Sequence, residues 1–283
     1  MIPLELWPLA DRRRIIGVFT DIDDTLTTDG AITAEALAAL ADLTAAGLNV
    51  IPITGRPVGW SVAFAGGDAA LGIAPWPVDA IVAENGAVAL FKSKKGVFPT
   101  SYIDSLLSKI YQQDASTRAA NFVRMQQVAK RVLREVPGAC LSQDSPGRET
   151  DIAIDHSEFS RLSAEKITQA VHIMQDEGMN ATVSSIHING WFGAHNKLEG
   201  ARWIVRELLS RDLDSEIDRW VFVGDSTNDQ LMFAHFPHSI GVANIRRFAA
   251  GLSHQPRYIT QGERGTGFAE VATAIGNGRN TLA

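Results

Sequence analysis

A short apolar run that ends in clustered carboxylates constrains this chain more than any other stretch. Residues 15–19 read Ile-Ile-Gly-Val-Phe, a partly β-branched run that suits a strand buried on both faces. Asp21, Asp23 and Asp24 follow directly. Buried like charges repel one another, and Mg²⁺ is the cation that hard oxygen ligands favour. The stretch therefore predicts a magnesium site at a strand end, with a solvated acidic turn as the alternative.

Two further strand ends carry polar residues that suit phosphate and metal chemistry. An apolar run over 48–53 ends in Thr54-Gly55-Arg56-Pro57, which reads either as a plain strand-to-helix turn or as a phosphate-binding loop. Another run over 220–223 ends in Gly-Asp-Ser-Thr-Asn-Asp, residues 224–229. This second stretch reads either as a capped helix start or as a metal site built from Asp225 and Asp229.

Lys197 begins a predicted helix, where the helix dipole slightly disfavours a positive charge. The position makes more sense if the ammonium group binds an anion. The other three signals lie at the ends of predicted strands, which is where open α/β sheets bind ligands.

The alternation of strands and helices predicts an α/β fold, but its rhythm changes in the middle of the chain. We expect a core domain over 1–87 and 189–283, and a small inserted α+β domain over 88–188. The insert is predicted to contain a hairpin over 89–97, helices over 102–112, 117–134 and 163–175, and strands over 151–155 and 182–188.

Composition restricts the function classes. A formal net charge of -6 argues against a nucleic-acid partner. Cys140 is the only cysteine, so no internal disulfide can form, and no apolar run is long enough to span a bilayer. We expect a soluble, cytoplasmic protein without a membrane partner. The sequence makes no prediction of the oligomeric state.

The order Asp21-x-Asp23-x-Thr25, followed by Thr54, Lys197 and the 224–229 stretch, resembles the haloacid dehalogenase (HAD) superfamily of phosphohydrolases. The Ala-Glu-Asn-Gly-Ala segment at 83–87 and the size of the insert look like the C2B-capped members, subfamily IIB, of the Cof-like and sucrose-phosphatase-like kind. This resemblance implies a Rossmann-like, doubly wound parallel sheet with an inserted α+β cap. The family often has Gly directly after the motif lysine, whereas here Leu198 and Glu199 intervene before Gly200.

The resemblance also implies roles for the motif residues. Asp21 would be the nucleophile that forms an aspartyl-phosphate, and Asp23 the general acid/base. Lys197 would neutralise the nucleophile and the phosphoryl group. Phosphate binding would fall to Thr54, Gly55 and Lys197, and Mg²⁺ binding to Asp21, Asp23, Asp225 and Asp229.

The cap would contact the part of the substrate that is not phosphate. Candidates for that contact are Arg148, Glu149, Asp151, His187, Asn189 and Trp191. Four of them also have a structural explanation. Arg148 and Glu149 suit a solvated loop pair, and His187 and Trp191 suit packing.

The implied activity is Mg²⁺-dependent hydrolysis of a small phosphate ester, most simply a sugar phosphate. A phosphotransferase like phosphomannomutase is the alternative, since it shares this core and cap type. It would need cationic cap groups for a second phosphate, for which Arg118, Arg124 and Arg148 are available. A non-catalytic binding protein on the same fold is the third possibility.

Overall fold

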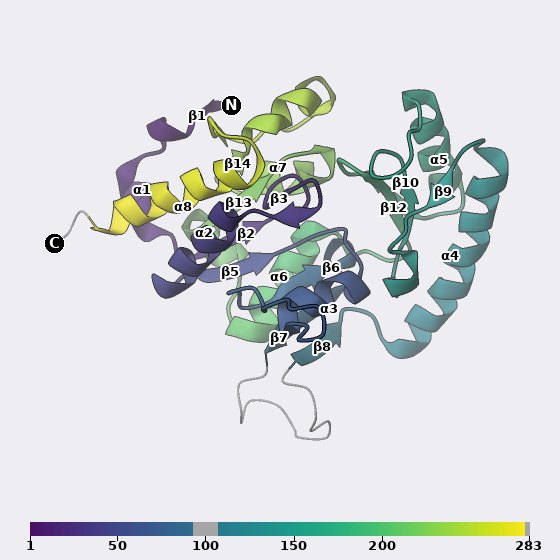
Figure 1. Ribbon diagram of the computed structural model, residues 1–283, viewed down its shortest axis with the longest axis horizontal. Helices are drawn as coiled ribbons and strands as arrows, with labels where there is room; N and C mark the ends of the chain where they lie inside the picture. The colour runs from purple at the N-terminus through teal and green to yellow at the C-terminus, as the bar shows by residue number, and fades with distance from the viewer. Residues whose placement is uncertain (93–106, 281–283) are drawn as a thin grey trace.

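A six-stranded parallel sheet forms the centre of the protein, whose computed structural model describes residues 1–92 and 107–280 (Figure 1). Every neighbouring pair in this sheet is parallel, which confirms the predicted α/β class. The strands are, in spatial order, β1 (Ile2–Pro3), β15 (Tyr258–Ile259), β14 (His238–Gly241), β13 (Trp220–Gly224), β2 (Gly17–Thr20) and β5 (Asn49–Pro52).

Helices cover both faces of the sheet, as a doubly wound fold requires. One apolar layer packs α2 (Ala34–Ala45), α3 (Val58–Gly66) and α8 (Arg264–Asn280) on the sheet, with α1 (Leu9–Arg14) beside α8. The other layer packs α6 (Lys197–Leu209) and α7 (Gln230–His235). Short elements complete the described structure: η1 (Leu4–Leu6), η2 (Glu84–Gly86), η3 (Ser145–Gly147), η4 (Asp214–Arg219), η5 (Thr227–Asp229), η6 (Ala243–Gly251), and the two-stranded ribbon β3 (Thr27–Thr28) and β4 (Ala31–Ile32).

A three-stranded antiparallel sheet adjoins the edge of the core. β6 (Ile81–Ala83) meets the core edge through a bridge between Ile53 and Val82, and it pairs with β7 (Val88–Lys92), which pairs with β8 (Leu107–Tyr111). The helix predicted over 102–112 is therefore wrong for 107–111, because pairing along β7 outweighs local helix propensity. The predicted hairpin tip at 93–97 lies outside the described residues, and the partner of β7 is β8.

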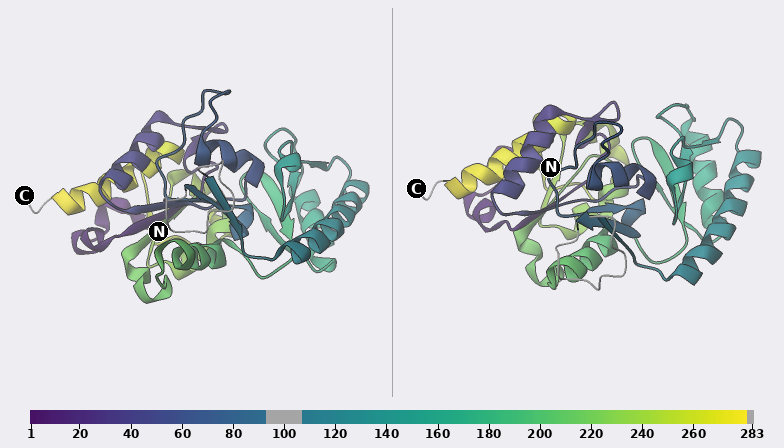
Figure 2. Two further views of the ribbon diagram at one scale, coloured as in Figure 1. Left: turned by 90° about the horizontal axis from the view of Figure 1, so that it is seen from below. Right: turned by 60° about the horizontal axis from the view of Figure 1, so that its bottom comes forward.

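The inserted region forms a four-stranded antiparallel sheet with two helices on one face, as expected for an α+β insert. Figure 2 shows it to one side of the core. Its second predicted strand, over 182–188, is two strands instead, because Ser184 Oγ accepts hydrogen bonds from the backbone N–H groups of Ile186 and His187 in a turn. The elements are β11 (Asn180–Val183), β12 (His187–Trp191), β10 (Ile152–Asp155), β9 (Cys140–Leu141), α4 (Ala115–Glu135) and α5 (Ala164–Asp176).

The insert boundaries of 88 and 188 stay a prediction. Strand pairing associates β7 and β8 with β6, and it includes all of β12 in the insert's sheet. We use the name cap for the four-stranded sheet with α4 and α5. Within the described residues, no helix is both long enough and apolar enough to cross a membrane.

The core sheet changes direction at β2, which has β5 on one side and β13 on the other. Later strands then continue on the β13 side. Ligands bind in the crevice at such a switch point, outside the carboxyl ends of the strands. Asp21 follows β2 and Asp225 follows β13, so the fold itself brings these two carboxylates together.

Gly86 allows the start of α6 to approach the end of β6. Its φ is 106°, and a Cβ atom there would lie 2.3 Å from the carbonyl oxygen of Asn196, the N-cap residue of α6. Gly47 also has a positive φ, 78°, but a Cβ there would meet nothing within 4 Å. A side chain at Gly47 would therefore meet backbone strain alone, whereas one at Gly86 would meet both strain and a steric clash.

Gly86→Ala is expected to lower the free energy of unfolding by more than about 3 kcal/mol, since strain and a backbone clash add. Gly47→Ala, the control, should cost only about 1 kcal/mol. Urea denaturation of both variants measures the difference. Equal costs would contradict the close approach of α6.

Candidate active site

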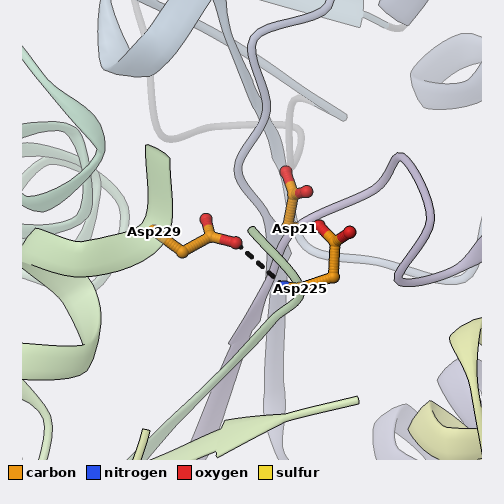
Figure 3. A group of neighbouring side chains, drawn as sticks. All are labelled: Asp21, Asp225 and Asp229. Carbon is orange, nitrogen blue, oxygen red and sulfur yellow. Dashed lines mark hydrogen bonds between the residues drawn. The ribbon is translucent and has the colours of Figure 1, made fainter. Parts of the chain in front are cut away.

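Three buried aspartates meet at the carboxyl ends of β2 and β13. Asp21 follows β2, Asp225 follows β13, and Asp229 ends η5. One carboxylate oxygen from each lies within 4.8 Å of the others. Figure 3 shows the three side chains and the hydrogen bond that the backbone N–H of Asp225 donates to Asp229. Residues far apart in the sequence thus form one acidic cluster.

Lys197 connects two members of this cluster. Its buried ammonium group donates to Asp21 Oδ1 at 2.7 Å and to Asp229 Oδ1 at 2.8 Å. The other oxygen of Asp229 accepts from the backbone N–H groups of Asp225 and Ser226, at 3.0 and 3.3 Å. Because both oxygens of Asp229 are occupied, its carboxylate orients Lys197 and the loop that carries Asp225.

The negative charges of this cluster outnumber the positive charge of Lys197. Three carboxylates face one ammonium group, so two negative charges have no counterpart among these residues. Burial raises the pKa of Asp21 to about 7, although Lys197 opposes the shift, and burial also raises the pKa of Asp225 well above its ordinary value. Burial lowers the pKa of Lys197, but Asp21 and Asp229 outweigh this and raise it.

The cluster fits a divalent cation. Asp225 Oδ1 is buried without a hydrogen-bond partner in the described structure, whereas Asp225 Oδ2 accepts from Asn244 Nδ2 at 3.1 Å. An orphaned carboxylate oxygen beside a surplus of negative charge is the environment that a hard cation such as Mg²⁺ would stabilise. Asn244 Nδ2 also donates to the carbonyl oxygen of Asp24, which fixes the two loops relative to each other.

Asp23 faces a different partner. Both of its carboxylate oxygens accept from Arg56 Nε at 3.0 Å, and Arg56 Nη2 lies 2.9 Å from Asp23 Oδ1. Arg56 also donates to Glu158 at 2.7 Å and to Asp144 at 3.3 Å. Burial opposes the charge of Arg56, but Asp23 and Glu158 raise its pKa. The core therefore holds Asp23 through an arginine that the cap also contacts.

Thr54 and Gly55 follow β5 and Ile53, at the strand end that the sequence predicted. Thr54 is buried, and its Oγ1 accepts the backbone N–H of Arg56 at 3.0 Å, which shapes the turn. A Cβ on Gly55 would lie 3.1 Å from Asn189 Oδ1, so little room remains between this turn and the cap.

Arg148, Asp151 and Asn189 form a buried junction between cap and core. Arg148 Nη1 donates to both Asp151 oxygens at 2.8 and 3.0 Å and to the Gly55 carbonyl at 2.9 Å. Asn189 Nδ2 donates to Asp151 at 3.0 Å and to the same carbonyl at 3.3 Å. Burial raises the pKa of Asp151 to about 7 against the charge of Arg148. These polar groups are already paired with one another, and through the Gly55 carbonyl they support the turn after β5.

The remaining cap candidates each form a contact within the protein. His187 Nε2 and Glu158 Oε2 are 2.8 Å apart, so His187 supports the group that holds Arg56. The Glu149 carboxylate accepts from Lys109 at 2.7 Å and from the Tyr111 hydroxyl, both on β8. The Trp191 indole N–H donates to the His195 carbonyl at 2.8 Å.

Sequence reasoning missed three residues of this region. Arg56 is part of the Thr54-Gly55-Arg56-Pro57 stretch, and a cation in a predicted phosphate-binding loop could have indicated a functional residue. Glu158 gave no local signal, because its importance depends on the fold. Glu84 was assigned no role, yet its buried carboxylate accepts from the backbone N–H groups of Val58 and Glu149, both at 3.0 Å, and so ties core to cap.

A cleft of about 940 Å³ opens beside Asp23 between core and cap. We call it the Asp23 cleft. Its volume falls within the range of small-molecule sites. Lining residues include Asp23, Asp24, Arg56, Trp60 and Arg264 from the core and Asp144, Glu158, Phe159 and Arg161 from the inserted region.

A family model of haloacid dehalogenase-like hydrolases matches residues 18–250, which include Lys197, Arg56 and the three clustered aspartates. The chain belongs to the haloacid dehalogenase-like hydrolases. The resemblance inferred from its motifs is therefore confirmed. A search of curated proteins finds no significant match.

Solved structures share the fold of this hydrolase across nearly its full length. The sucrose-phosphatase from Synechocystis sp. PCC6803, in complex with sucrose and phosphate, has a TM-score of 0.62 at 13% identity, covering 93% of this chain and 98% of that one. The HAD subclass IIB sugar phosphatase BT4131 has a TM-score of 0.57 at 15% identity, covering 92% and 98%. A haloacid dehalogenase-like hydrolase from B. subtilis has a TM-score of 0.60 at 13% identity, covering 92% and 99%.

His195, two residues before Lys197, is a further buried group of the hydrolase. Its side chain is 4% exposed, stacks on Trp191, and has no hydrogen-bond partner at either ring nitrogen in the described structure. Burial lowers its pKa to about 4. The unfolded chain binds this proton near the ordinary histidine pKa of about 6.5. Between these values the unfolded state holds more protons, so acidification destabilises the fold.

His195→Phe should remove this pH dependence while keeping the stacked ring. The contribution of neutral His195 to the free energy of unfolding is fully present above about pH 6.5. On acidification to pH 4, the free energy of unfolding of the wild type is expected to fall by about 3 kcal/mol more than that of the variant. Urea denaturation across this range measures the difference, with His172→Gln on the exposed face of α5 as the control. Parallel pH curves for wild type and His195→Phe would contradict the buried neutral imidazole.

Proposed function

We propose that this hydrolase is a Mg²⁺-dependent phosphatase of a small phosphate ester, acting through an aspartyl-phosphate. The observation that carries the proposal is the buried Lys197–Asp21 pair beside the uncompensated carboxylate of Asp225. A nucleophilic carboxylate, a cation that binds a phosphoryl oxygen and a place for a metal are thus combined in one site. Catalysis of phosphoryl transfer depends mainly on such positioning and charge stabilisation.

In the proposed reaction, a carboxylate oxygen of Asp21 attacks phosphorus and the bond to the leaving oxygen breaks. Asp23 gives that oxygen a proton, and it later takes a proton from the water that hydrolyses the aspartyl-phosphate. Lys197 stabilises negative charge on the phosphoryl group, and the Thr54 hydroxyl donates a hydrogen bond to the same group. Hydrolysis then restores Asp21 and releases inorganic phosphate.

Asp21 and Asp225 would hold Mg²⁺, with the backbone carbonyl of Asp23. Bound there, the ion would supply charge neutralisation for the phosphoryl oxygens. Asp229 was predicted as a further ligand. We propose that it acts by orienting, because both of its oxygens already accept hydrogen bonds from Lys197 and the Asp225 loop.

We propose an organic leaving group with hydroxyls, such as a sugar. The Asp23 cleft is large enough for such a group, and polar residues line most of it. Support comes from the structures with the same fold that are described as sucrose-phosphatase and sugar phosphatase.

The phosphotransferase alternative gains no support from the three arginines named for it. Arg118 stacks on Tyr111 at 3.5 Å, Arg124 stacks on Phe192 at 3.8 Å, and Arg148 belongs to the buried junction with Asp151. None of them lines the Asp23 cleft. We therefore favour transfer of the phosphoryl group to water.

The test is phosphate release from a panel of sugar phosphates and p-nitrophenyl phosphate, with and without Mg²⁺. Wild-type enzyme should release phosphate only with Mg²⁺. Asp21→Asn should lower kcat by at least about 10³-fold, because the amide cannot attack phosphorus. Asp225→Asn should need a higher Mg²⁺ concentration for half-maximal rate.

Asp218→Asn is the matched control, since Asp218 is a half-exposed aspartate that pairs with Arg14 on the surface. It should keep full activity. Full turnover by Asp21→Asn would overturn the nucleophile assignment. An isomerised sugar phosphate without free phosphate would favour the phosphotransferase.

A further inference from the structure

The Asp23 cleft contains more charge than the transferred phosphoryl group requires. Five carboxylates and four guanidinium groups line it. Whether the cleft repels or attracts a second anion depends on which of these charges are already paired.

Every lining carboxylate has an arginine within ion-pair distance. Arg56 pairs with Asp23, Asp144 and Glu158 at 2.7–3.3 Å. Arg264 lies 3.0 Å from Asp24 and 3.6 Å from Asp29. These two guanidinium groups are thus shared among five carboxylates, and Arg148 is a further counterion of Asp144 at 3.1 Å.

Arg161 is different. It is exposed, lines the cleft from the cap, and has no ion-pair or hydrogen-bond partner among the described residues. Arg247 lines the cleft from η6 of the core, and its partner Glu263, at 3.0 Å, lies outside the lining. Among the described residues, Arg161 is therefore the lining charge that no opposite charge of the protein engages, and its guanidinium group is free to bind a second anion.

The loop that carries Arg161 is braced. The Asp155 carboxylate accepts backbone N–H groups of Ser157, Glu158 and Phe159 at 2.9–3.1 Å. Glu158 is fixed by Arg56 and His187. Ordering a loop costs conformational entropy, and here contacts within the protein have already offset much of that cost.

Phe159 gives this loop an apolar face. Its side chain lines the cleft and is 65% exposed, so the ring is accessible to a ligand there. An aromatic ring can pack on the C–H face of a sugar ring or a short carbon chain. A guanidinium group two residues later can bind a carboxylate or phosphate by two hydrogen bonds.

We propose that residues 157–161 form a subsite for the leaving group, and that the leaving group carries a second anionic group, bound by Arg161. This inference rests on the proposed phosphatase activity and narrows its substrate class to organic phosphates with an additional carboxylate or phosphate. The organic part packs on Phe159, and Arg56 keeps the neighbouring carboxylates away from the bound anion.

Two matched substrate pairs test the inference with wild-type enzyme and Mg²⁺. The carboxylate pair is 3-phosphoglycerate and glycerol 3-phosphate, and the phosphate pair is fructose 1,6-bisphosphate and fructose 1-phosphate. In one of the two pairs, the member with the second anionic group should have a kcat/KM at least about tenfold higher than its partner. A charge-assisted hydrogen bond to Arg161 would supply a difference of this size. The pair that discriminates identifies the second anion.

Arg161→Gln should abolish that preference, mainly by raising KM, and Arg161→Lys should restore part of it. Arg134→Gln is the control, because Arg134 is a 69% exposed arginine on α4 of the cap that pairs with Glu135 outside the cleft. It should leave the ratio of the two kcat/KM values unchanged.

Hydrolysis of p-nitrophenyl phosphate in the same assays separates the two proposals. If this ester is hydrolysed but neither pair discriminates, or if Arg161→Gln lowers both members of a pair equally, the anion subsite is overturned and the phosphatase stands. If no phosphate ester is hydrolysed, the phosphatase proposal fails, and the subsite fails with it.

Discussion

The bridge that Lys197 makes between Asp21 and Asp229 is the interaction on which the rest of this site depends. It joins the loop after β2 to the start of α6, 176 residues later, and to the end of η5. Burying the ammonium group is costly, and two carboxylates at 2.7 and 2.8 Å offset that cost. The bridge still leaves the cluster with surplus negative charge. The same cluster also leaves Asp225 Oδ1 buried without a hydrogen-bond partner in the described structure, which is the reason for the cation site that we propose there.

Arg56 plays the corresponding part at the boundary between core and cap. Removing it would leave the carboxylates of Asp23, Asp144 and Glu158 close together without their shared counterion. Buried groups of this kind are costly when unpaired, so the position of the cap and the orientation of Asp23 are coupled through one side chain. Glu84 and the junction around Arg148 add contacts between the same two parts. The cap thus acts on the position of Asp23 through contacts within the protein.

The sequence predicted the fold class and the strand-end positions of Asp21, Thr54 and Asp225, because each follows a short apolar run and parallel strands end at the same edge. It also placed the cap helices α4 and α5. It could not predict that 107–111 would pair with β7, since that depends on an edge supplied by distant residues. For the same reason the Arg56–Glu158 contact was not predictable, although Arg56 lay beside a recognised turn. Arg148 and Asn189 were named as substrate contacts, but the structure pairs them with Asp151 and the Gly55 carbonyl.

The most direct test of the account is to trap the covalent intermediate. Enzyme that is turning over its best substrate with Mg²⁺ is quenched in acid and reduced with borohydride, which converts an aspartyl-phosphate to homoserine. Mass spectrometry of the peptides then locates the modified position. We expect homoserine at position 21 in wild-type enzyme and none in Asp21→Asn. A modification at another residue, or steady turnover without a modified aspartate at any quench time, would contradict it.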